Sequence, residues 1–391
     1  MRLSRVLTLS ALALGSLCLT APLAAQSSMF GVNGLGLPGR PLTPSTLATG
    51  GSFGLFDGES DLNPAALADL KSVAAGLVVA NAWRDWDVPA GTASLRGSRY
   101  PLFSIAGPVP RTRLGVGVSA GTYADRDFSL ASSDTIQLRG APVTTHDTLT
   151  ALGGLSEVRL AIGFASSRRT SLGAAVYWIT GSSRMSAHRV FADSTIAPSR
   201  QSAELSYQGV GMALGLTHRL SDQLRLAVLV RSDGEAAVRR DGRHVYDVDL
   251  PYTFSVGAQA RPSRRMTIGV AGSFRTWSGA NSDMLEQGGV GAYNTLELAA
   301  GAEVARSLGH PSTLPLRFGV RYAELPFPIV AGQRPRELGL SAGTGGRFAQ
   351  DRAGIDVSAE YAWRSEGSPY KERALTIAFG LSIRPYGPGK R

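Results

Sequence analysis

Three arginines that could bind an acid group stand within alternating apolar segments. Arg159, Arg317 and Arg321 each lie between two apolar residues. A guanidinium group offers a planar fork of donors that fits a carboxylate, so these residues are candidate contacts for the acid headgroup of a ligand. The alternative is a structural ladder in which they pair with acidic residues at similar positions in other segments. An unpaired charge in a water-poor interior is costly, and we therefore favour the ladder. The candidate acidic partners are Glu157, Glu297, Glu303, Asp356 and Glu360.

Residue patterns of enzymes and cofactor sites are incomplete in this chain. The segment 34–39, Gly-Leu-Gly-Leu-Pro-Gly, matches a dinucleotide fingerprint by its letters, but no buried strand precedes it and Pro38 interrupts it. The histidines are far apart and lack the spacing of metal ligands. They are His146, His188, His218, His244 and His310. We expect no enzyme, no catalytic residue, no cofactor and no metal.

The first 25 residues have the three parts of a secretory signal peptide. Arg2 and Arg5 precede an apolar run over 6–19, and small residues follow up to Ala25, after which we expect cleavage. Cys18 is the only cysteine and lies in this leader, so the mature chain would form no disulfide. The sequence therefore predicts an exported protein whose fold begins near residue 26.

The elements that would position the arginines are strands with a strict period of two. From Leu375 to Ile383, apolar residues at odd positions alternate with small or polar residues at even positions. Such a strand has one oily face and one polar face, as in a barrel with lipid outside and a polar lumen. Fourteen segments of this kind are predicted, and the chain is assigned to the all-β class as a transmembrane antiparallel β-barrel. They cover 72–83, 94–107, 113–124, 154–165, 170–182, 203–219, 223–233, 250–261, 265–277, 293–306, 314–324, 336–348, 353–364 and 371–384. A soluble β-sandwich or propeller also alternates, but its core would not tolerate the inward charges.

Composition agrees with a barrel in the outer membrane of a bacterium. Mean hydropathy is +0.01 with 47 glycines, and after the leader no apolar run approaches the roughly 18 residues of a spanning helix. The formal net charge of +10 comes almost entirely from arginine. Because the arginines are scattered, they do not form the basic stripe of a nucleic-acid site. Outer-membrane lipid and lipopolysaccharide are the simpler partners for this charge, and we expect a monomer that crosses the membrane many times.

Connections between the predicted strands alternate in length, which orients the barrel. Short turns alternate with longer polar segments, as periplasmic turns alternate with extracellular loops. The predicted extracellular loops are 125–153, 183–202, 234–249, 278–292 and 325–335. The last contains Phe327, Ile329 and Val330, which are unusually apolar for a loop. They could form a capture surface for a greasy ligand, or the loop could equally be tucked into the barrel mouth.

The glycine-rich stretch between the leader and the first strand carries a family resemblance. The stretch ends in Asn63-Pro64-Ala65 and a short apolar run, and the first strand follows at once. This arrangement resembles the FadL family of outer-membrane transporters, including its PorV-like relatives. The resemblance implies a fourteen-stranded barrel with residues 26–71 as a luminal hatch and residues 72–391 as the barrel. A disordered periplasmic tail is the alternative for the stretch 26–71.

The resemblance also implies a function, namely passive uptake of hydrophobic small molecules such as fatty acids or aromatic hydrocarbons. In the family these leave sideways through a gap near the third strand. Here the third strand contains Gly115, Gly117 and Gly121, which could permit a kink in the wall. Two alternatives stay open: a PorV-like role in protein secretion or surface anchoring, and a general porin.

Overall fold

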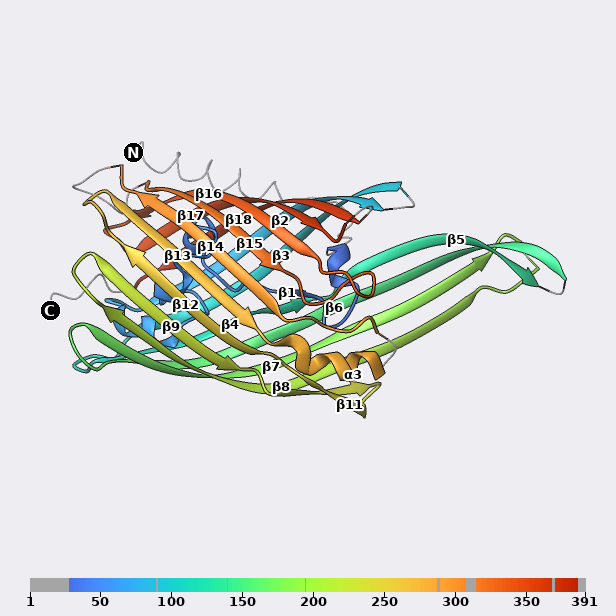
Figure 1. Cartoon of the computed structure of the whole chain (residues 1–391), viewed down its shortest axis with the longest axis horizontal. Helices are drawn as coiled ribbons and strands as arrows, with labels where there is room; N and C mark the ends of the chain where they lie inside the picture. The colour runs from blue at the N-terminus through green and yellow to red at the C-terminus, as the bar shows by residue number, and fades with distance from the viewer. Residues whose placement is uncertain are drawn as a thin grey trace, which may run out of the picture.

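The predicted fourteen-stranded antiparallel barrel is confirmed in the computed structural model of the chain. The structure describes residues 28–88, 91–138, 140–193, 195–286, 289–306, 314–367 and 370–385. The leader with Cys18 lies outside these residues. The strands wind obliquely around a long axis, and β18 pairs antiparallel with β2, which closes the ring (Figure 1).

The fourteen wall strands follow one another around the ring in chain order. They are β2 (Ala74–Val88), β3 (Gly91–Pro108), β4 (Leu114–Asp125), β6 (Ala141–Ala165), β7 (Thr170–Phe191), β8 (Ser199–Arg219), β9 (Leu224–Ser232), β12 (Tyr252–Ala260), β13 (Met266–Arg275), β14 (Thr295–Val304), β15 (Leu316–Glu324), β16 (Arg336–Phe348), β17 (Ala353–Ser365) and β18 (Lys371–Ile383). Each overlaps one predicted segment, because the period of two marks every stretch that has an oily outer face and a small or polar inner face.

The second half of β6, residues 154–165, shows how the wall is built. Val158 and Leu160 point outward with 37% and 45% of their surface exposed. Glu157 and Arg159 point inward and are only 2% and 3% exposed. An exterior of this kind is stable in contact with lipid, because charges placed there would cost a few kcal/mol each near the midplane. The described residues contain no helix long and apolar enough to span a bilayer.

Three predicted loops are wrong, because the chain continues there as strands. The segments 125–153 and 183–202 contain β5 (Phe128–Leu138) and the far ends of β6, β7 and β8. Together these strands form an arm that extends well beyond the rest of the barrel (Figure 1). The segment 234–249 is a hairpin of β10 (Glu235–Arg240) and β11 (Arg243–Asp249). Serine, threonine and charged residues occupy both faces of the arm, so its strands carry no oily alternation.

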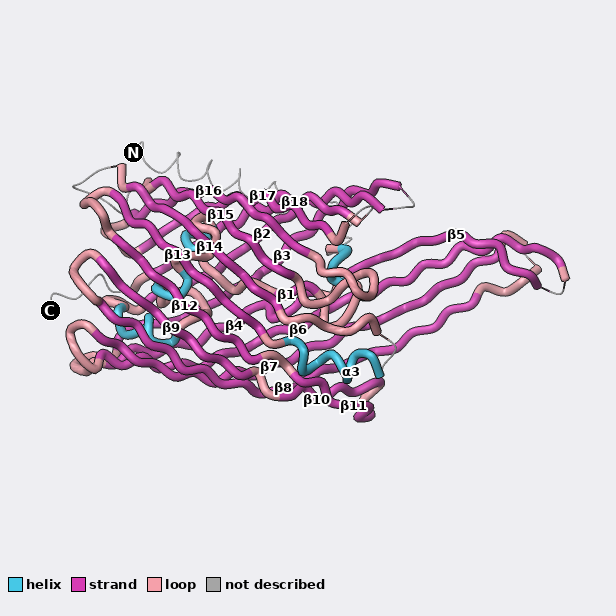
Figure 2. The backbone as a smooth tube through the Cα atoms, in the orientation of Figure 1, coloured by secondary structure: helices cyan, strands magenta, loops and turns pink. Residues whose placement is uncertain are grey.

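The described residues of the other two predicted loops form no strand. Residues 278–292 include the last two residues of the short 3₁₀ helix η5 (Trp277–Gly279) and the α-helix α3 (Ala280–Glu286). Residues 325–335 have no regular element. The prediction of a loop therefore holds for 325–335, whereas 278–292 contains a short helix that was not predicted (Figure 2).

Residues 28–71, which we call the luminal segment, lie within the ring of strands. The segment is made of short elements joined by glycine-rich turns, because it has no repeating apolar pattern. They are η2 (Met29–Gly31), β1 (Leu37–Pro38), α2 (Pro44–Leu47), η3 (Gly54–Phe56) and η4 (Pro64–Asp69). The 3₁₀ helix η4 packs against β4, β6, β7 and β8, whereas α2 packs against β16, β17 and β18. The segment thus contacts opposite sides of the barrel.

Candidate functional site

The pairing of β3 with β4 ends part of the way along the wall. The two strands are paired from Leu102 and Gly121 down to Pro108 and Gly115. Beyond this point the described residues of β3 pair with β2, while β4 continues alone on that side. Residues 122–125 of β4, which we call the free edge, therefore present main-chain groups that need another partner.

The luminal segment supplies that partner. Leu37 and Pro38 of β1 pair antiparallel with Asp125 and Ala124 of the free edge. The amide of Gly39 also donates a hydrogen bond of 2.7 Å to the Tyr123 carbonyl. A piece of the luminal segment thus takes the position that β3 would otherwise occupy.

Close approach of main chains at this junction requires glycine. A Cβ atom on Gly39 would lie 1.9 Å from the carbonyl oxygen of Thr122. Gly36 has a φ of +100°, a conformation that side chains disfavour, and it faces the carbonyl of Asp125. Two of the glycines that resemble a dinucleotide fingerprint in the sequence, Gly36 and Gly39, therefore allow β1 to lie against the wall.

The predicted wall glycines lie in β4, directly below the free edge. Gly115 and Gly117 face Leu67 of the luminal segment, and Gly121 faces Pro41. The irregularity in this strand falls just beyond them, at Tyr123. Between Thr122 and Ala124 the register of β4 against β6 shifts by one residue. Such a bulge bends a strand locally.

Asn63, Pro64 and Ala65 form the start of η4, which packs against β4, β6, β7 and β8. The Asn63 side chain accepts a hydrogen bond of 3.1 Å from the Ala65 amide and donates one of 3.0 Å to the Leu55 carbonyl. It caps η4, and Pro64 occupies the first position, where its missing amide costs nothing. The motif therefore fixes a sharp turn against the inner wall.

Arg159, one of the three predicted headgroup contacts, is paired with the luminal segment. Its Nη1 atom lies 3.0 Å from Asp61 Oδ1, and both side chains are almost fully buried. Arg231 lies beside this pair, forms ion pairs with Glu157 and Asp233, and stacks on the Tyr177 ring at 3.8 Å. Because Arg159 is engaged, its position agrees better with a structural ladder than with a free headgroup site.

The other two predicted contacts are also paired. Arg317 forms ion pairs of 2.6 Å with both Glu303 and Asp356. Arg321 is in contact with Glu337 and has Glu297 at 3.8 Å. All three arginines thus have carboxylates from the chain itself as partners.

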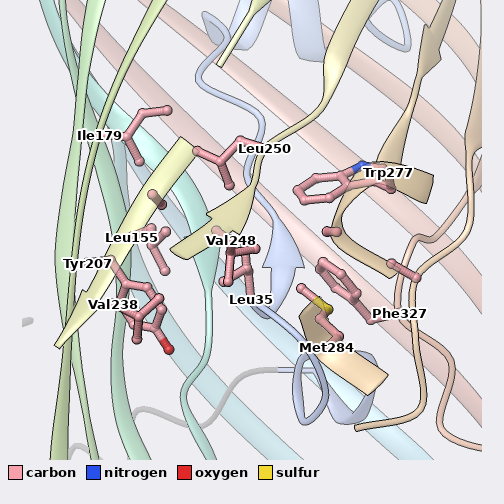
Figure 3. Packing of buried hydrophobic residues seen from close by; sticks show 14 residues of the cluster. Leu35, Leu155, Ile179, Tyr207, Val238, Val248, Leu250, Trp277, Met284 and Phe327 are labelled. Carbon is pink, nitrogen blue, oxygen red and sulfur yellow. The ribbon is translucent and has the colours of Figure 1, made fainter. Parts of the chain in front are cut away.

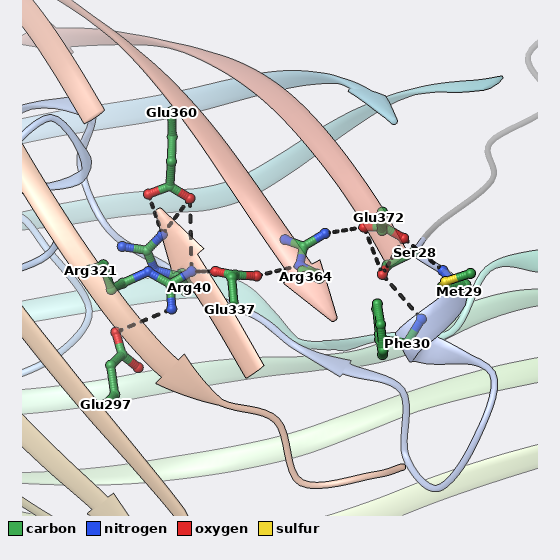
Figure 4. Close-up of polar contacts among 10 residues, drawn as sticks. All are labelled: Ser28, Met29, Phe30, Arg40, Glu297, Arg321, Glu337, Glu360, Arg364 and Glu372. Atoms are coloured by element: carbon green, nitrogen blue, oxygen red, sulfur yellow. Dashed lines mark hydrogen bonds and ion pairs between the residues drawn. The ribbon is translucent and has the colours of Figure 1, made fainter. Parts of the chain in front are cut away.

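A chain of alternating charges ties the luminal segment to the wall (Figure 4). Arg40 bonds Glu360 at 2.7 Å. Along the inner face of the wall, Arg364 forms ion pairs with both Glu337 and Glu372. The Glu372 carboxylate accepts hydrogen bonds from the Ser28 hydroxyl at 2.8 Å and from the Met29 amide at 3.0 Å. The start of the luminal segment and a point near its middle are therefore both anchored in β17 and β18.

The apolar loop 325–335 is tucked into the barrel mouth. Phe327 is 1% exposed and packs edge to face on Trp277, with ring centroids 5.1 Å apart (Figure 3). The amides of Ile329 and Val330 each donate a 2.7 Å hydrogen bond to the Glu366 carboxylate. Phe327 therefore helps to close the mouth over the luminal segment.

A cavity of about 190 Å³ lies behind the junction of β1 and β4. Its lining combines apolar atoms with six arginine and five acidic side chains. The apolar part includes Leu37, Pro38, Leu47, Ala80, Leu325 and Pro326; the arginines are Arg40, Arg84, Arg99, Arg275, Arg321 and Arg364. In the described part of the chain, no cluster of three or more histidine, cysteine, aspartate or glutamate side chains could hold a metal ion.

Two elements of this site were missed in the sequence. The strand β1 is too short to show alternation, and its pairing with β4 joins residues that are far apart in the chain. Arg40 had a weak signal as an isolated charge in a glycine-rich and apolar stretch, and Asp61 had one as the last of three nearby acidic residues after Asp57 and Glu59.

No protein-family model matches this sequence, and no curated protein resembles it significantly. Solved structures do resemble the fold. The chain is similar to the CymD monoaromatic hydrocarbon channel, with a TM-score of 0.56 and 14% identity over 89% of this chain and 98% of that one. A Pseudomonas aeruginosa FadL homologue gives a TM-score of 0.59 with 12% identity over 90% and 100% of the two chains. The Ralstonia pickettii toluene transporter TbuX gives 0.57 with 12% identity over 89% and 99%.

These similarities extend over nearly the full length of each solved chain. The chain therefore has the FadL-type barrel fold, as its sequence predicted. At such low identity the likeness concerns the fold, and what the chain carries must be argued from its own residues.

Proposed function

We propose that this chain is a bacterial outer-membrane channel for the passive uptake of hydrophobic small molecules, of the fatty-acid or aromatic-hydrocarbon type. The luminal segment acts as its hatch, and the junction of β1 with β4 acts as a gate in the wall. The solved structures of similar fold include hydrocarbon channels, which supports this class of cargo.

The observation that carries the proposal is the occupation of the free edge by β1. A hydrophobic molecule that leaves sideways avoids the charged lumen, because the outer surface of the wall is in contact with lipid. The free edge of β4 is the place where a lateral exit needs no broken wall pairing. Opening there must release the short pairing with Leu37 and Pro38, the Gly39 hydrogen bond, and the ion pairs of Arg99 on β3 with Asp125 and Asp127.

A general porin is less well supported. The luminal segment packs against opposite sides of the wall, and the charges that face the lumen are largely paired with one another. A polar solute would meet mostly charges that already have partners in the chain.

A disulfide across the gate tests the proposal. Pro38 and Ala124 are directly opposite, and the Gly39 bond to Tyr123 makes theirs a non-hydrogen-bonded pair, in which Cα atoms lie about 4.5 Å apart. This spacing allows a disulfide. The double variant Pro38→Cys and Ala124→Cys should lose transfer of toluene or decanoate into proteoliposomes when oxidised and recover it when reduced.

Each single cysteine variant is the control, since the leader holds the only native cysteine. Transfer that is equally fast in the oxidised and the reduced double variant would refute a gate at this junction. Absence of transfer by the wild-type protein for every hydrophobic compound would refute the transport function itself.

A further inference from the structure

Arg275 occupies an unusual position in the lumen. It is the last residue of β13 and lies between Thr253 of β12 and Thr295 of β14 in the sheet. Its neighbour Phe274 faces outward with 41% of its surface exposed, so Arg275 faces inward. It lines the main cavity and two smaller cavities beside it.

Arg275 differs from the other arginines around the main cavity in its partners. Arg40, Arg99, Arg321 and Arg364 each form an ion pair with a carboxylate of the chain. Arg84 is also engaged. Within the described residues, neither an ion pair nor a side-chain hydrogen bond involves Arg275.

Two acidic residues of the cavity lining, Glu297 and Glu324, have other partners, although the charge of Arg275 also acts on Glu297. Glu297 lies 3.8 Å from Arg321, and a Glu324 oxygen accepts a 3.0 Å hydrogen bond from the Leu296 amide. The guanidinium of Arg275 therefore keeps its donors available toward the cavity. A cation next to an apolar cavity attracts an anion that brings its own apolar body.

The cavity size limits that body. An engineered apolar cavity of about 150 Å³ binds benzene. The main cavity has about 190 Å³, which suits one six-membered ring with one small substituent. Leu37, Pro38 and Leu47 from the luminal segment and Leu325 from the mouth loop provide apolar contacts for such a ring.

We propose that the cavity binds monocyclic aromatic carboxylates, such as benzoate, with the carboxylate held by Arg275. This inference rests on the proposed function and narrows its substrate class. The ring lies against the apolar lining behind β1, and the carboxylate accepts the two parallel hydrogen bonds of the guanidinium fork. Arg275, and none of the ion-paired arginines, determines the preference for an acid.

Equilibrium dialysis of the purified full-length protein in detergent tests the inference with radiolabelled benzoate, toluene and decanoate as probes. The variant Arg275→Gln should bind benzoate at least about tenfold more weakly, the loss expected for one charge-assisted pair, and should bind toluene as before. The variant Arg275→Lys keeps the charge and should bind benzoate with intermediate affinity.

The matched control is Arg317→Gln, which removes an ion-paired arginine outside the cavity lining and should leave benzoate binding unchanged. Heat modifiability on gels verifies that each variant has a closed barrel. Equal benzoate binding by Arg275→Gln and the wild type would overturn the assignment, as would decanoate binding that matches benzoate in strength.

The two proposals fail in different ways. A wild-type protein that binds toluene but not benzoate overturns the acid preference and leaves the transport proposal intact. A wild-type protein that binds neither probe and transfers no compound overturns both.

Discussion

The two halves of β6 lie in very different surroundings. From residue 154 onward, the strand has lipid-facing apolar residues on one side and buried charges such as Glu157 and Arg159 on the other. Before residue 154, in the arm, the residues from Pro142 to Thr150 are mostly exposed or half-buried on both faces. The same hydrogen-bonded strand thus passes from a packed wall to a sheet surrounded by solvent.

This contrast shows which contacts carry the energy of the fold. In the wall, most inward charges are removed from water and are paired with other wall residues or with the luminal segment, and breaking such a buried pair is costly. In the arm, water solvates the charges, and their pairing contributes little. Disturbing the lumen should therefore affect the whole molecule, whereas disturbing the arm should remain a local event.

Deletion of residues 28–60 is expected to have the largest effect. The barrel should still close, because the pairing of β18 with β2 does not involve these residues. The lumen would then fill with water and conduct ions, and planar bilayers should show discrete conductance steps that the intact protein lacks. A truncated barrel as tight as the intact one would contradict the proposal that the luminal segment is a hatch.

Removal of one buried carboxylate should have the next largest effect. Glu337 is 2% exposed and forms ion pairs with Arg321 and Arg364. Glu337→Ala leaves two buried cations without this partner and should lower the free energy of unfolding in micelles by about 3–5 kcal/mol.

The control for Glu337 lies in the arm. Glu204 pairs with Arg184 at 3.2 Å, with side chains 44% and 70% exposed. Glu204→Ala should cost at most about 1 kcal/mol, because the pair is solvated. Similar losses in the two variants would remove the distinction between lumen and arm.

A smaller effect is expected from a single methyl group between wall and luminal segment. A Cβ atom on Gly115 would lie 2.1 Å from the Leu67 carbonyl oxygen, whereas a Cβ atom on Gly346 would meet nothing within 4 Å. Gly115→Ala should therefore displace η4 and cost about 1–3 kcal/mol of unfolding free energy. Gly346→Ala is the matched control and should be silent. The measurement is denaturant unfolding followed by tryptophan fluorescence.

The smallest effect concerns the arm alone. A hydrogen bond from Arg189 lowers the pKa of Asp147 below its usual value. A lowered pKa stabilises the folded arm above about pH 4, the ordinary value for aspartate, and this contribution is lost as the pH falls through the folded pKa. The protection factors of β6 and β7 amides, corrected for the intrinsic pH dependence of hydrogen exchange, should thus fall in acid near this pair only. Asp147→Asn should abolish the pH dependence there and leave the barrel amides unchanged.

Sequence reasoning located the wall strands because two different environments imprint a period of two on them. For β16, the predicted and observed bounds are both 336–348. The arm strand β5 was missed because Ser132, Ser133 and Asp134 lie in its middle and neither face requires apolar residues. An alternating pattern marks strands whose two faces meet different surroundings, and it does not mark strands that have water on both sides.

The site was less accessible from the sequence than the fold. The chemistry of Arg159, Arg317 and Arg321 was recognised, but their partners come from other strands and from the luminal segment. The isolation of Arg275 depends on which carboxylates its neighbours engage. Such information resides in three-dimensional neighbourhoods, and no local pattern around residue 275 contains it.

The junction of β1 with the free edge of β4 is made by main-chain atoms, so apart from the glycines at positions 36 and 39 its hydrogen bonds do not depend on side chains. A substitution of Leu37 would therefore change the shape of the cavity behind it, while the main-chain hydrogen bonds of the junction persist. The preference for a ligand and the opening of the junction thus depend on different groups. Single substitutions in the cavity lining would thus change the imported compound and leave the opening of the junction as it is.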